Sequence, residues 1–335
     1  MEPWLEVSLA GIAIAWVHQC MRCGFRQIRP RLSAARLAAL YPTEYFDTGS
    51  VRGYRDYARQ FHRHQRDAYF LTKRFRPIAP AGPVLEVGCA LGFLLAGLAK
   101  AGWEVEGIDV SPFAAYYAQT RFGLQVACTT LEEQAFPGEH FAIVIQKDVL
   151  EHVSDPRRHL VETHRIMRRG GYLWVVTPNG EANLRPLSRT AQETARHGRR
   201  VLPLLDQGHL SFFALRHLMG LVSECGFDCV RARVIGVGRG LRALGVLPGQ
   251  RRFMAEIGQE RAEQPSDERS ASRASETEER YRAVAEHIDR AIEAWRSPIK
   301  RWVPYYYLHR LFKQLGMLPA RTEVGYDFDL LLRKK

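Results

Sequence analysis

A glycine-rich loop and a later acidic residue are the parts of this chain best suited to binding a nucleoside. Residues 84–95 read as an apolar strand that runs into Gly88-x-Ala90-x-Gly92 and then into a helix. Glycine at position 88 lets a ligand approach the backbone, and the free N–H groups of the following helix face the same cleft. Asp109 lies 21 residues after Gly88, where a carboxylate can accept both hydroxyls of a ribose. The alternative is an ordinary strand–turn–helix in which the aspartate only caps the next helix.

The residues around the glycines indicate which ligand class suits the cleft. A dinucleotide-binding loop needs a third glycine three residues after the second, and Leu95 stands there instead. Glu86 lies just before the loop, where its negative charge disfavours a pyrophosphate. The residues therefore favour a ligand that carries positive charge.

Alternating strand and helix signals predict how the loop and the acid are positioned. The predicted strands are 83–87, 103–109, 141–145 and 172–177, and the predicted helices are 92–100, 112–121 and 155–170. Ser111 and Pro112 form an N-cap and a first helical residue. This alternation predicts an α/β fold with a parallel, doubly wound sheet. An upstream helix rich in arginine and aromatic residues is predicted over 52–76.

The C-terminal part follows a different pattern. A helix is predicted at 215–225, a strand at 227–235, and a last strand from Val324 to Leu332, where apolar residues alternate. Residues 264–277 have the composition of a disordered linker, and a helix is predicted from about 278. Because the two terminal strands can pair, the roughly 85 residues between them are predicted to be an insertion.

The order of the motifs resembles that of a known enzyme family. Glu86-x-Gly88-x-x-x-Gly92, followed by Gly-Ile-Asp-x-Ser-Pro at 107–112, resembles the class I S-adenosylmethionine-dependent methyltransferases; segments 148–156, 165–179, 208–213 and 225–227 are similar to later motifs of that family. Ala90 departs from the family pattern, which usually has glycine there. The resemblance implies a Rossmann-like seven-stranded sheet, mostly parallel with an antiparallel last strand, plus an α-helical insertion before that strand.

We therefore divide the chain into four regions. Residues 1–48 form an N-terminal cysteine-containing segment, 49–238 the methyltransferase core, 239–318 the helical insertion and 319–335 the last strand of the core. These boundaries are expectations from the motifs and from the change in composition.

The resemblance also implies S-adenosyl-L-methionine as the cofactor and a set of residues that hold it. Glu86 and the loop at Gly88 would hold the methionine part, Asp109 the ribose hydroxyls, and Val110 would lie against adenine. The implied cofactor-binding residues are Glu86, Gly88, Cys89, Ala90, Gly92, Asp109, Val110, Thr130, Leu131, Glu132, Gln146 and Lys147. Because a sulfonium methyl is already electrophilic, the protein would mainly align an acceptor with it.

Two histidines are candidate general bases for the acceptor. His209 follows Gly208 in a predicted cleft loop; its alternative is a structural or helix-capping role. His152 ends the sequence Asp148-x-x-Glu151-His152, which resembles the metal-binding E-x-x-E-H of ubiquinone-pathway O-methyltransferases. Similar sequences also occur in methyltransferases without a metal, so a cleft-lining role is preferred and no metal site is predicted.

The N-terminal segment carries the C-x-x-C pair Cys20 and Cys23. It resembles the second half of a zinc ribbon that precedes the methyltransferase domain in some bacterial enzymes linked to sugar or surface-glycan chemistry. Tetrahedral zinc needs four ligands, so a hairpin packed beside the cofactor domain is favoured over a zinc site.

The apolar run 7–17 is too short to span a bilayer and favours a buried helix or strand pair over a surface anchor. Six cysteines without a secretory signal predict a reducing, cytoplasmic location.

The net charge of +12 is concentrated in two segments. Residues 22–76 contain 13 basic and four acidic residues, and 185–200 contain five arginines and one acid. We interpret them as a basic collar at the acceptor entrance, which favours an anionic small-molecule, sugar or lipid-linked acceptor. Nucleic acid is disfavoured because no base-flipping motif follows the 141–145 strand. An RNA or DNA methyltransferase is one alternative; a non-catalytic scaffold with peripheral contact to the membrane surface through 302–316 is another.

Overall fold

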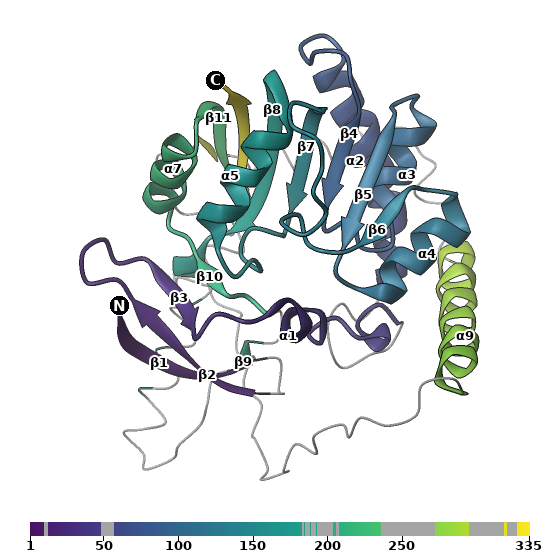
Figure 1. The fold of residues 1–335 in the computed structure, drawn as a ribbon, viewed down its shortest axis with the longest axis horizontal. Helices are drawn as coiled ribbons and strands as arrows, with labels where there is room; N and C mark the ends of the chain where they lie inside the picture. The colour runs from purple at the N-terminus through teal and green to yellow at the C-terminus, as the bar shows by residue number, and fades with distance from the viewer. Residues whose placement is uncertain are drawn as a thin grey trace.

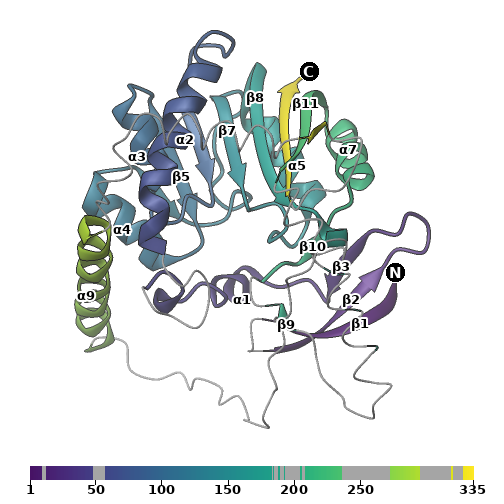
Figure 2. The same ribbon diagram turned by 180° about the vertical axis from the view of Figure 1, so that it is seen from behind.

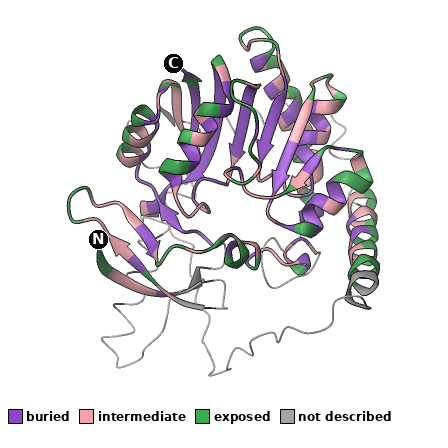
Figure 3. Ribbon diagram, viewed as in Figure 1, coloured by how far each residue is buried: buried purple, intermediate pink, exposed green. Residues whose placement is uncertain are grey.

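The computed structural model of the protein places a large sheet between two layers of helices. It describes residues 1–9, 13–47, 57–182, 184, 188, 192, 204–205, 208–235, 272–294, 318–319 and 327–335. Helices α5 (Pro156–Ile166) and α7 (Leu215–Glu224) cover the face seen in Figure 1, and α2 (Gln60–Phe75) and α3 (Phe93–Lys100) cover the opposite face (Figure 2). Figure 3 shows that the central strands are buried throughout, as expected for a parallel sheet packed on both sides.

The large sheet has the strand order β12-β11-β13-β8-β7-β4-β5-β6. The strands are β4 (Val84–Val87), β5 (Val105–Asp109), β6 (Val126–Cys128), β7 (Phe141–Lys147), β8 (Met167–Pro178), β11 (Phe227–Ile235), β12 (Leu318–Pro319) and β13 (Asp327–Lys334). The strands from β6 to β8 pair in parallel, whereas β13 lies antiparallel between β8 and β11. This confirms the predicted Rossmann-like seven-stranded sheet with an antiparallel last strand, to which β12 adds a two-residue edge.

Capping residues in the sequence determine where the helices after the strands begin and end. Helix α4 (Pro112–Phe122) begins with Ser111 as its N-cap and ends at Gly123, whose φ of +63° suits a glycine. Helix α5 begins after Asp155, which caps it through Arg158 N. The helix predicted to run to about Gly170 ends instead at Ile166, because β8 begins at Met167 and pairs with Phe141 of β7.

A second sheet lies beside the large sheet, at the end where the parallel strands β4, β5 and β7 terminate (Figure 1). Its order is β10-β3-β2-β1-β9, with β1 (Glu2–Leu9), β2 (Ala13–Gln19), β3 (Arg26–Arg29), β9 (Leu204–Leu205) and β10 (Ser211–Phe212). The apolar run 7–17 therefore contributes a strand pair, with Val7 and Val17 fully buried. The part of the chain that the structure describes has no helix long and apolar enough to cross a membrane.

Helix α9 (Ser272–Ala294) lies in the sequence between β11 and β13 and packs against α4. It begins at Ser272, so the end of the predicted 264–277 linker is helical, while 264–271 lie outside the described residues. Its Ala285 and Ile288 are buried in a cluster with Phe113. Tyr117 Oη of α4 donates a hydrogen bond to Asp289 Oδ1 of α9 (2.5 Å).

Candidate active site

A cavity of about 570 Å³ opens where the parallel strands β4, β5 and β7 end. This is the position at which open α/β sheets bind their ligands. The sequence-predicted residues that line it are Glu86, Gly88, Cys89, Ala90, Asp109, Val110, Thr130, Leu131, Glu132, Lys147, His152 and His209. The fold thus brings most of the predicted cofactor residues and both candidate bases to one cavity.

The glycine loop closes against strand β5. The backbone N–H groups of Gly88 and Cys89 both donate to Ile108 O (2.8 and 3.1 Å), and the N–H of Ala90 donates to Asp109 Oδ2 (2.8 Å). Gly88 has a φ of +65°, and a Cβ there would lie 2.7 Å from Val149 Cγ2. Position 88 therefore requires glycine for both its backbone conformation and its close packing.

Asp109 ends β5 with a buried carboxylate that faces the cavity. Its Oδ1 accepts the N–H of Ser111 (2.8 Å), and its Oδ2 accepts the N–H of Ala90. Burial raises the pKa of Asp109, while the backbone N–H groups oppose that rise. A carboxylate oxygen can accept more than one hydrogen bond, so both oxygens can also accept from a diol.

Glu86 places a second buried carboxyl group on the cavity wall. Its Oε2 is buried and has no hydrogen-bond partner among the residues that the structure describes. Burial raises the pKa of Glu86 to about 8, the positive charge of Lys147 lowers it, and Asp109 raises it further. Lys147 itself is paired with Asp148 (Nζ–Oδ2, 2.9 Å). A buried carboxyl group with one unsatisfied oxygen, beside an aspartate able to bind a diol, fits a cofactor that has a cationic end and a ribose, as S-adenosylmethionine does.

Gly92 and Gln146 lie away from the cavity wall, although the sequence grouped them with the cofactor residues. Gly92 adopts a φ of +72° before α3, and a Cβ there would lie 2.9 Å from Ala118 Cβ and 3.0 Å from Leu124 Cδ1. Gln146 is fully buried and donates through Nε2 to Thr163 Oγ1 of α5 (2.8 Å). Gly92 therefore serves helix packing, and Gln146 joins the sheet to α5.

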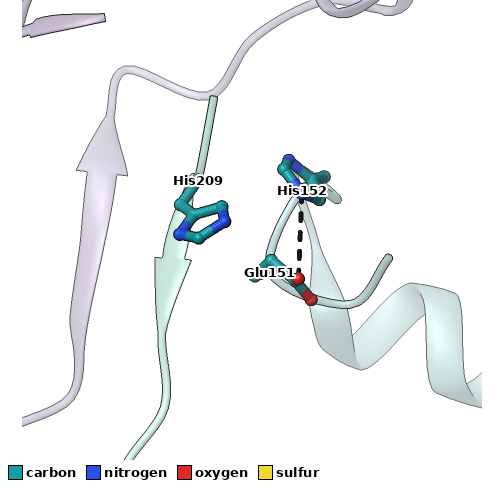
Figure 4. Close-up of side chains that lie close together, drawn as sticks. All are labelled: Glu151, His152 and His209. Atoms are coloured by element: carbon teal, nitrogen blue, oxygen red, sulfur yellow. Dashed lines mark ion pairs between the residues drawn. The ribbon is translucent and has the colours of Figure 1, made fainter. Parts of the chain in front are cut away.

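Glu151, His152 and His209 form a compact cluster at the other end of the cavity (Figure 4). One ligand atom from each residue lies within 4.8 Å of the other two, and His152 Nε2 is 3.8 Å from Glu151 Oε1. The side chain of His209 points toward the other two residues (Figure 4), and the two imidazole rings meet edge to face with centroids 4.9 Å apart. Asp148, the first residue of the Asp148-x-x-Glu151-His152 sequence, is paired with Lys147 and lies outside this cluster.

Burial opposes a charge on each residue of the cluster. It lowers the pKa of His152 to about 4 and that of His209 to about 3, and it raises the pKa of Glu151. Thr177 Oγ1 donates to Glu151 Oε2 (2.8 Å), whereas Glu151 Oε1 has no hydrogen-bond partner. Burial and the negative charge of Asp148 therefore both oppose ionisation of Glu151.

Several cavity residues were not predicted from the sequence. Helix α2 contributes Gln60, Arg63 and His64, and the chain before it contributes Leu32, Leu37, Tyr41, Tyr45 and Phe46. Arginine and aromatic spacing predicted the helix but not which face meets the cavity. The N-terminal segment was expected to pack beside the cofactor domain, but its sequence did not show which of its residues reach the cavity.

Comparisons with known proteins agree with this geometry. A family model described as a methyltransferase domain matches residues 57–232. The chain is 36% identical over 94 residues to a ubiquinone biosynthesis O-methyltransferase of Ruegeria sp. (strain TM1040), which covers 26% of this chain and 38% of the relative. It is 29% identical over 152 residues to a protein of the same name from Cereibacter sphaeroides (strain KD131), covering 44% of this chain and 60% of the relative.

Solved structures are similar as well. A SAM-dependent methyltransferase from Archaeoglobus fulgidus aligns with a TM-score of 0.41 at 16% identity, over 81% of this chain and 94% of that one. The Haemonchus contortus phosphoethanolamine N-methyltransferase 2 aligns with a TM-score of 0.44 at 15% identity, over 81% of this chain and 52% of that one. The chain spans between about a third and three fifths of the length of the curated relatives named above. Because the family model covers more than half of its residues, the chain belongs to the methyltransferase-domain family, whose cofactor is S-adenosylmethionine.

Proposed function

We propose that this protein transfers the methyl group of S-adenosylmethionine to an oxygen atom of a small-molecule acceptor. The observation that carries the proposal is a single cavity lined both by Glu86 and Asp109 and by the His152–His209 pair. The O-methyltransferase names of the relatives favour oxygen as the atom that receives the methyl group.

The cofactor end of the cavity would hold the ligand through three features of the chain. Asp109 offers acceptor positions to the ribose hydroxyls, and the carboxyl group of Glu86 faces the positively charged part. Thr130, Leu131 and Glu132 line the side of the cavity on which the adenine ring of the cofactor would lie. When bound, S-adenosylmethionine supplies an electrophilic methyl group, so the protein has to orient the acceptor and exclude water.

His209 is the proposed general base. It is neutral at physiological pH because burial lowers its pKa to about 3. No hydrogen bond to its imidazole is found among the described residues, unlike His152, which contacts Tyr41 and Gly208. A neutral imidazole at a cavity wall can accept the proton of an acceptor hydroxyl as the new O–C bond forms. Of the charged groups around it, Asp148 favours the protonated form of His209, whereas burial and His152 oppose it.

The charged residues in and around the cavity bear on the charge of the acceptor. Of the predicted basic collar, the arginines of 185–200 lie outside the described residues, whereas 22–76 is described except for 48–56 and places Arg63 on the cavity wall. The described wall of the cavity carries eight Asp or Glu residues and three Lys or Arg residues. We therefore propose that an uncharged hydroxyl of the acceptor enters this largely acidic cavity, while the arginines of 185–200 attract any anionic group that the acceptor carries. The proposed membrane contact through 302–316 also lies outside the described residues.

Calorimetric titration with S-adenosylmethionine and S-adenosylhomocysteine tests the cofactor assignment. We expect binding by the full chain, a loss of at least tenfold in affinity for Asp109→Ala, and no change for Asp228→Ala on the exposed surface of β11. A release assay for S-adenosylhomocysteine against a panel of hydroxylated small molecules would then identify the acceptor. Absence of binding to the wild-type chain, or equal binding by Asp109→Ala, would overturn the proposal.

A further inference from the structure

The segment from Arg31 to Asp47, here named the roof segment, crosses the cavity between its two ends. Ser154 Oγ donates to Leu32 O (2.8 Å), and Arg31 pairs with Asp155 (2.5 Å). Farther along, Ser111 Oγ donates to Tyr41 O (3.1 Å). The roof segment is thus attached both to the loop after β7 and to the loop after β5. It lies outside residues 57–232, which match the family model.

Tyr41 is the residue of the roof segment that meets the histidine cluster. Its hydroxyl lies 2.8 Å from His152 Nδ1, and its ring meets the imidazole edge to face with centroids 5.9 Å apart. Its backbone carbonyl accepts a hydrogen bond from Ser111 Oγ, and the backbone N–H of Ser111 donates a hydrogen bond to Asp109 Oδ1. Tyr41 therefore contacts the histidine cluster through its side chain, and through its backbone it contacts Ser111 beside Asp109.

The groups around His152 favour one tautomer of its ring. Gly208 O lies 3.2 Å from Nδ1, and a carbonyl oxygen can only accept a hydrogen bond. Nδ1 must therefore carry the proton, which it can share between Gly208 O and the hydroxyl oxygen of Tyr41. Nε2 is then unprotonated and faces Glu151 Oε1 at 3.8 Å.

We propose that Tyr41 is a positioning residue that fixes the orientation of the His152 ring, so that the roof segment completes an active site otherwise built by the methyltransferase domain. The proposal rests on the proposed function, in which His209 is the base. Tyr41 holds the ring of His152 in place against the ring of His209. This contact keeps the imidazole of His209 from turning away from the acceptor. Without the hydroxyl of Tyr41, the imidazole of His152 keeps only one of its two Nδ1 partners.

Long-range ¹H–¹⁵N spectra of the full chain labelled with ¹⁵N-histidine test this inference. The resonances of His152 are assigned by their loss in His152→Gln. In the wild type we expect His152 to be a single Nδ1–H tautomer at neutral pH. In Tyr41→Phe we expect Gly208 O to keep the Nδ1–H tautomer, while the ¹H and ¹⁵N resonances of that group shift because it has lost the shorter of its two contacts. The matched control is Tyr69→Phe, because Tyr69 is an exposed tyrosine of α2 that lies outside the cavity.

The possible outcomes are distinct. Unchanged His152 shifts in Tyr41→Phe, or equal changes in Tyr69→Phe, would overturn the positioning role. If Tyr41→Phe does not fold, fluorotyrosine at position 41 keeps the hydroxyl, and its ¹⁹F resonance should move on His152→Gln while one at position 69 should not; no movement would overturn the proposal. Titration with S-adenosylmethionine separates the two proposals, because its failure would remove the proposed function without altering the histidine spectra. Once an acceptor is known, we expect Tyr41→Phe to lower kcat about tenfold and leave KM for S-adenosylmethionine within about twofold.

Discussion

The backbone N–H of Ala90 donates a 2.8 Å hydrogen bond to Asp109 Oδ2, which joins the glycine loop to the end of β5. The other carboxylate oxygen of Asp109 holds the first turn of α4 through Ser111 N. The aspartate expected to bind ribose therefore also organises the empty cavity, and substitutions at this position affect stability as well as affinity.

Asp109→Asn should destabilise the protein even without a ligand. Asparagine has one oxygen, so its amide group would face either Ala90 N–H or Ser111 N–H as donor against donor. We expect a loss of about 1–3 kcal/mol in the free energy of unfolding, measured by urea denaturation. Asp228→Asn, at an exposed position of β11, should change it by less than about 0.5 kcal/mol. Equal stability of Asp109→Asn and the wild type would contradict the bridging role.

The carboxyl group of Glu86 should release a proton when S-adenosylmethionine binds. Burial raises its pKa to about 8, so the unliganded protein holds this proton at neutral pH. A cationic ligand favours the ionised form, so binding at pH about 7 should release about one proton. Calorimetry in buffers of different ionisation enthalpy measures the number released. Glu86→Gln should release none, whereas the exposed Glu224→Gln should behave like the wild type; proton release by Glu86→Gln would contradict this assignment.

The same carboxyl group should make the unliganded protein less stable as pH rises. Between about 4.5 and 8, the folded state keeps a proton that the unfolded chain has lost. The folded state binds more protons over this range, so the free energy of unfolding falls with increasing pH. Glu86→Gln should flatten this part of a stability-against-pH curve measured by urea denaturation. A curve as steep as that of the wild type would exclude Glu86 as the source.

Alanine substitutions should separate the roles of two glycines in the loop. In Gly92→Ala the new methyl group meets Ala118 and Leu124 behind the loop, so stability should fall by about 1–3 kcal/mol while affinity for S-adenosylmethionine stays within about twofold. In Gly88→Ala the methyl group meets Val149 at the cavity wall, so both stability and affinity should fall. Urea denaturation and calorimetry measure the two quantities. A loss of affinity in Gly92→Ala as large as in Gly88→Ala would restore a cofactor role for Gly92.

Ala90→Gly should be tolerated and should stabilise the loop. Ala90 has a φ of +48°, a left-handed conformation that costs an alanine about 1 kcal/mol and costs glycine little. The greater freedom of glycine in the unfolded chain offsets part of this gain, so we expect up to about 0.5 kcal/mol of added stability and unchanged affinity. The comparison variant is Ala99→Gly inside α3, which should lose about 1 kcal/mol. Clear destabilisation by Ala90→Gly in thermal or urea unfolding would show that the alanine methyl group is needed.

The sequence by itself determined the architecture of the large sheet. Strand and helix alternate with recognisable caps, such as Ser111 before α4 and Asp155 before α5, and these signals act over a few residues. Motif spacing also brought Glu86, Gly88 and Asp109 together, because residues at the carboxyl ends of adjacent parallel strands must meet at one edge. Strand alternation could have separated Gln146 from Lys147, since successive residues of a strand point to opposite faces.

Only the tertiary structure decided what covers the cavity. Tyr41 and His152 are 111 residues apart, and no periodicity or motif links them. Their contact depends on the N-terminal sheet, whose strand β3 pairs with β10 just after His209. The same packing buries Glu151, His152 and His209 and so shifts their pKa values, which residue type alone does not fix. Local sequence sets the elements because backbone and capping preferences are short-range, whereas desolvation and the approach of distant segments arise only when the chain packs.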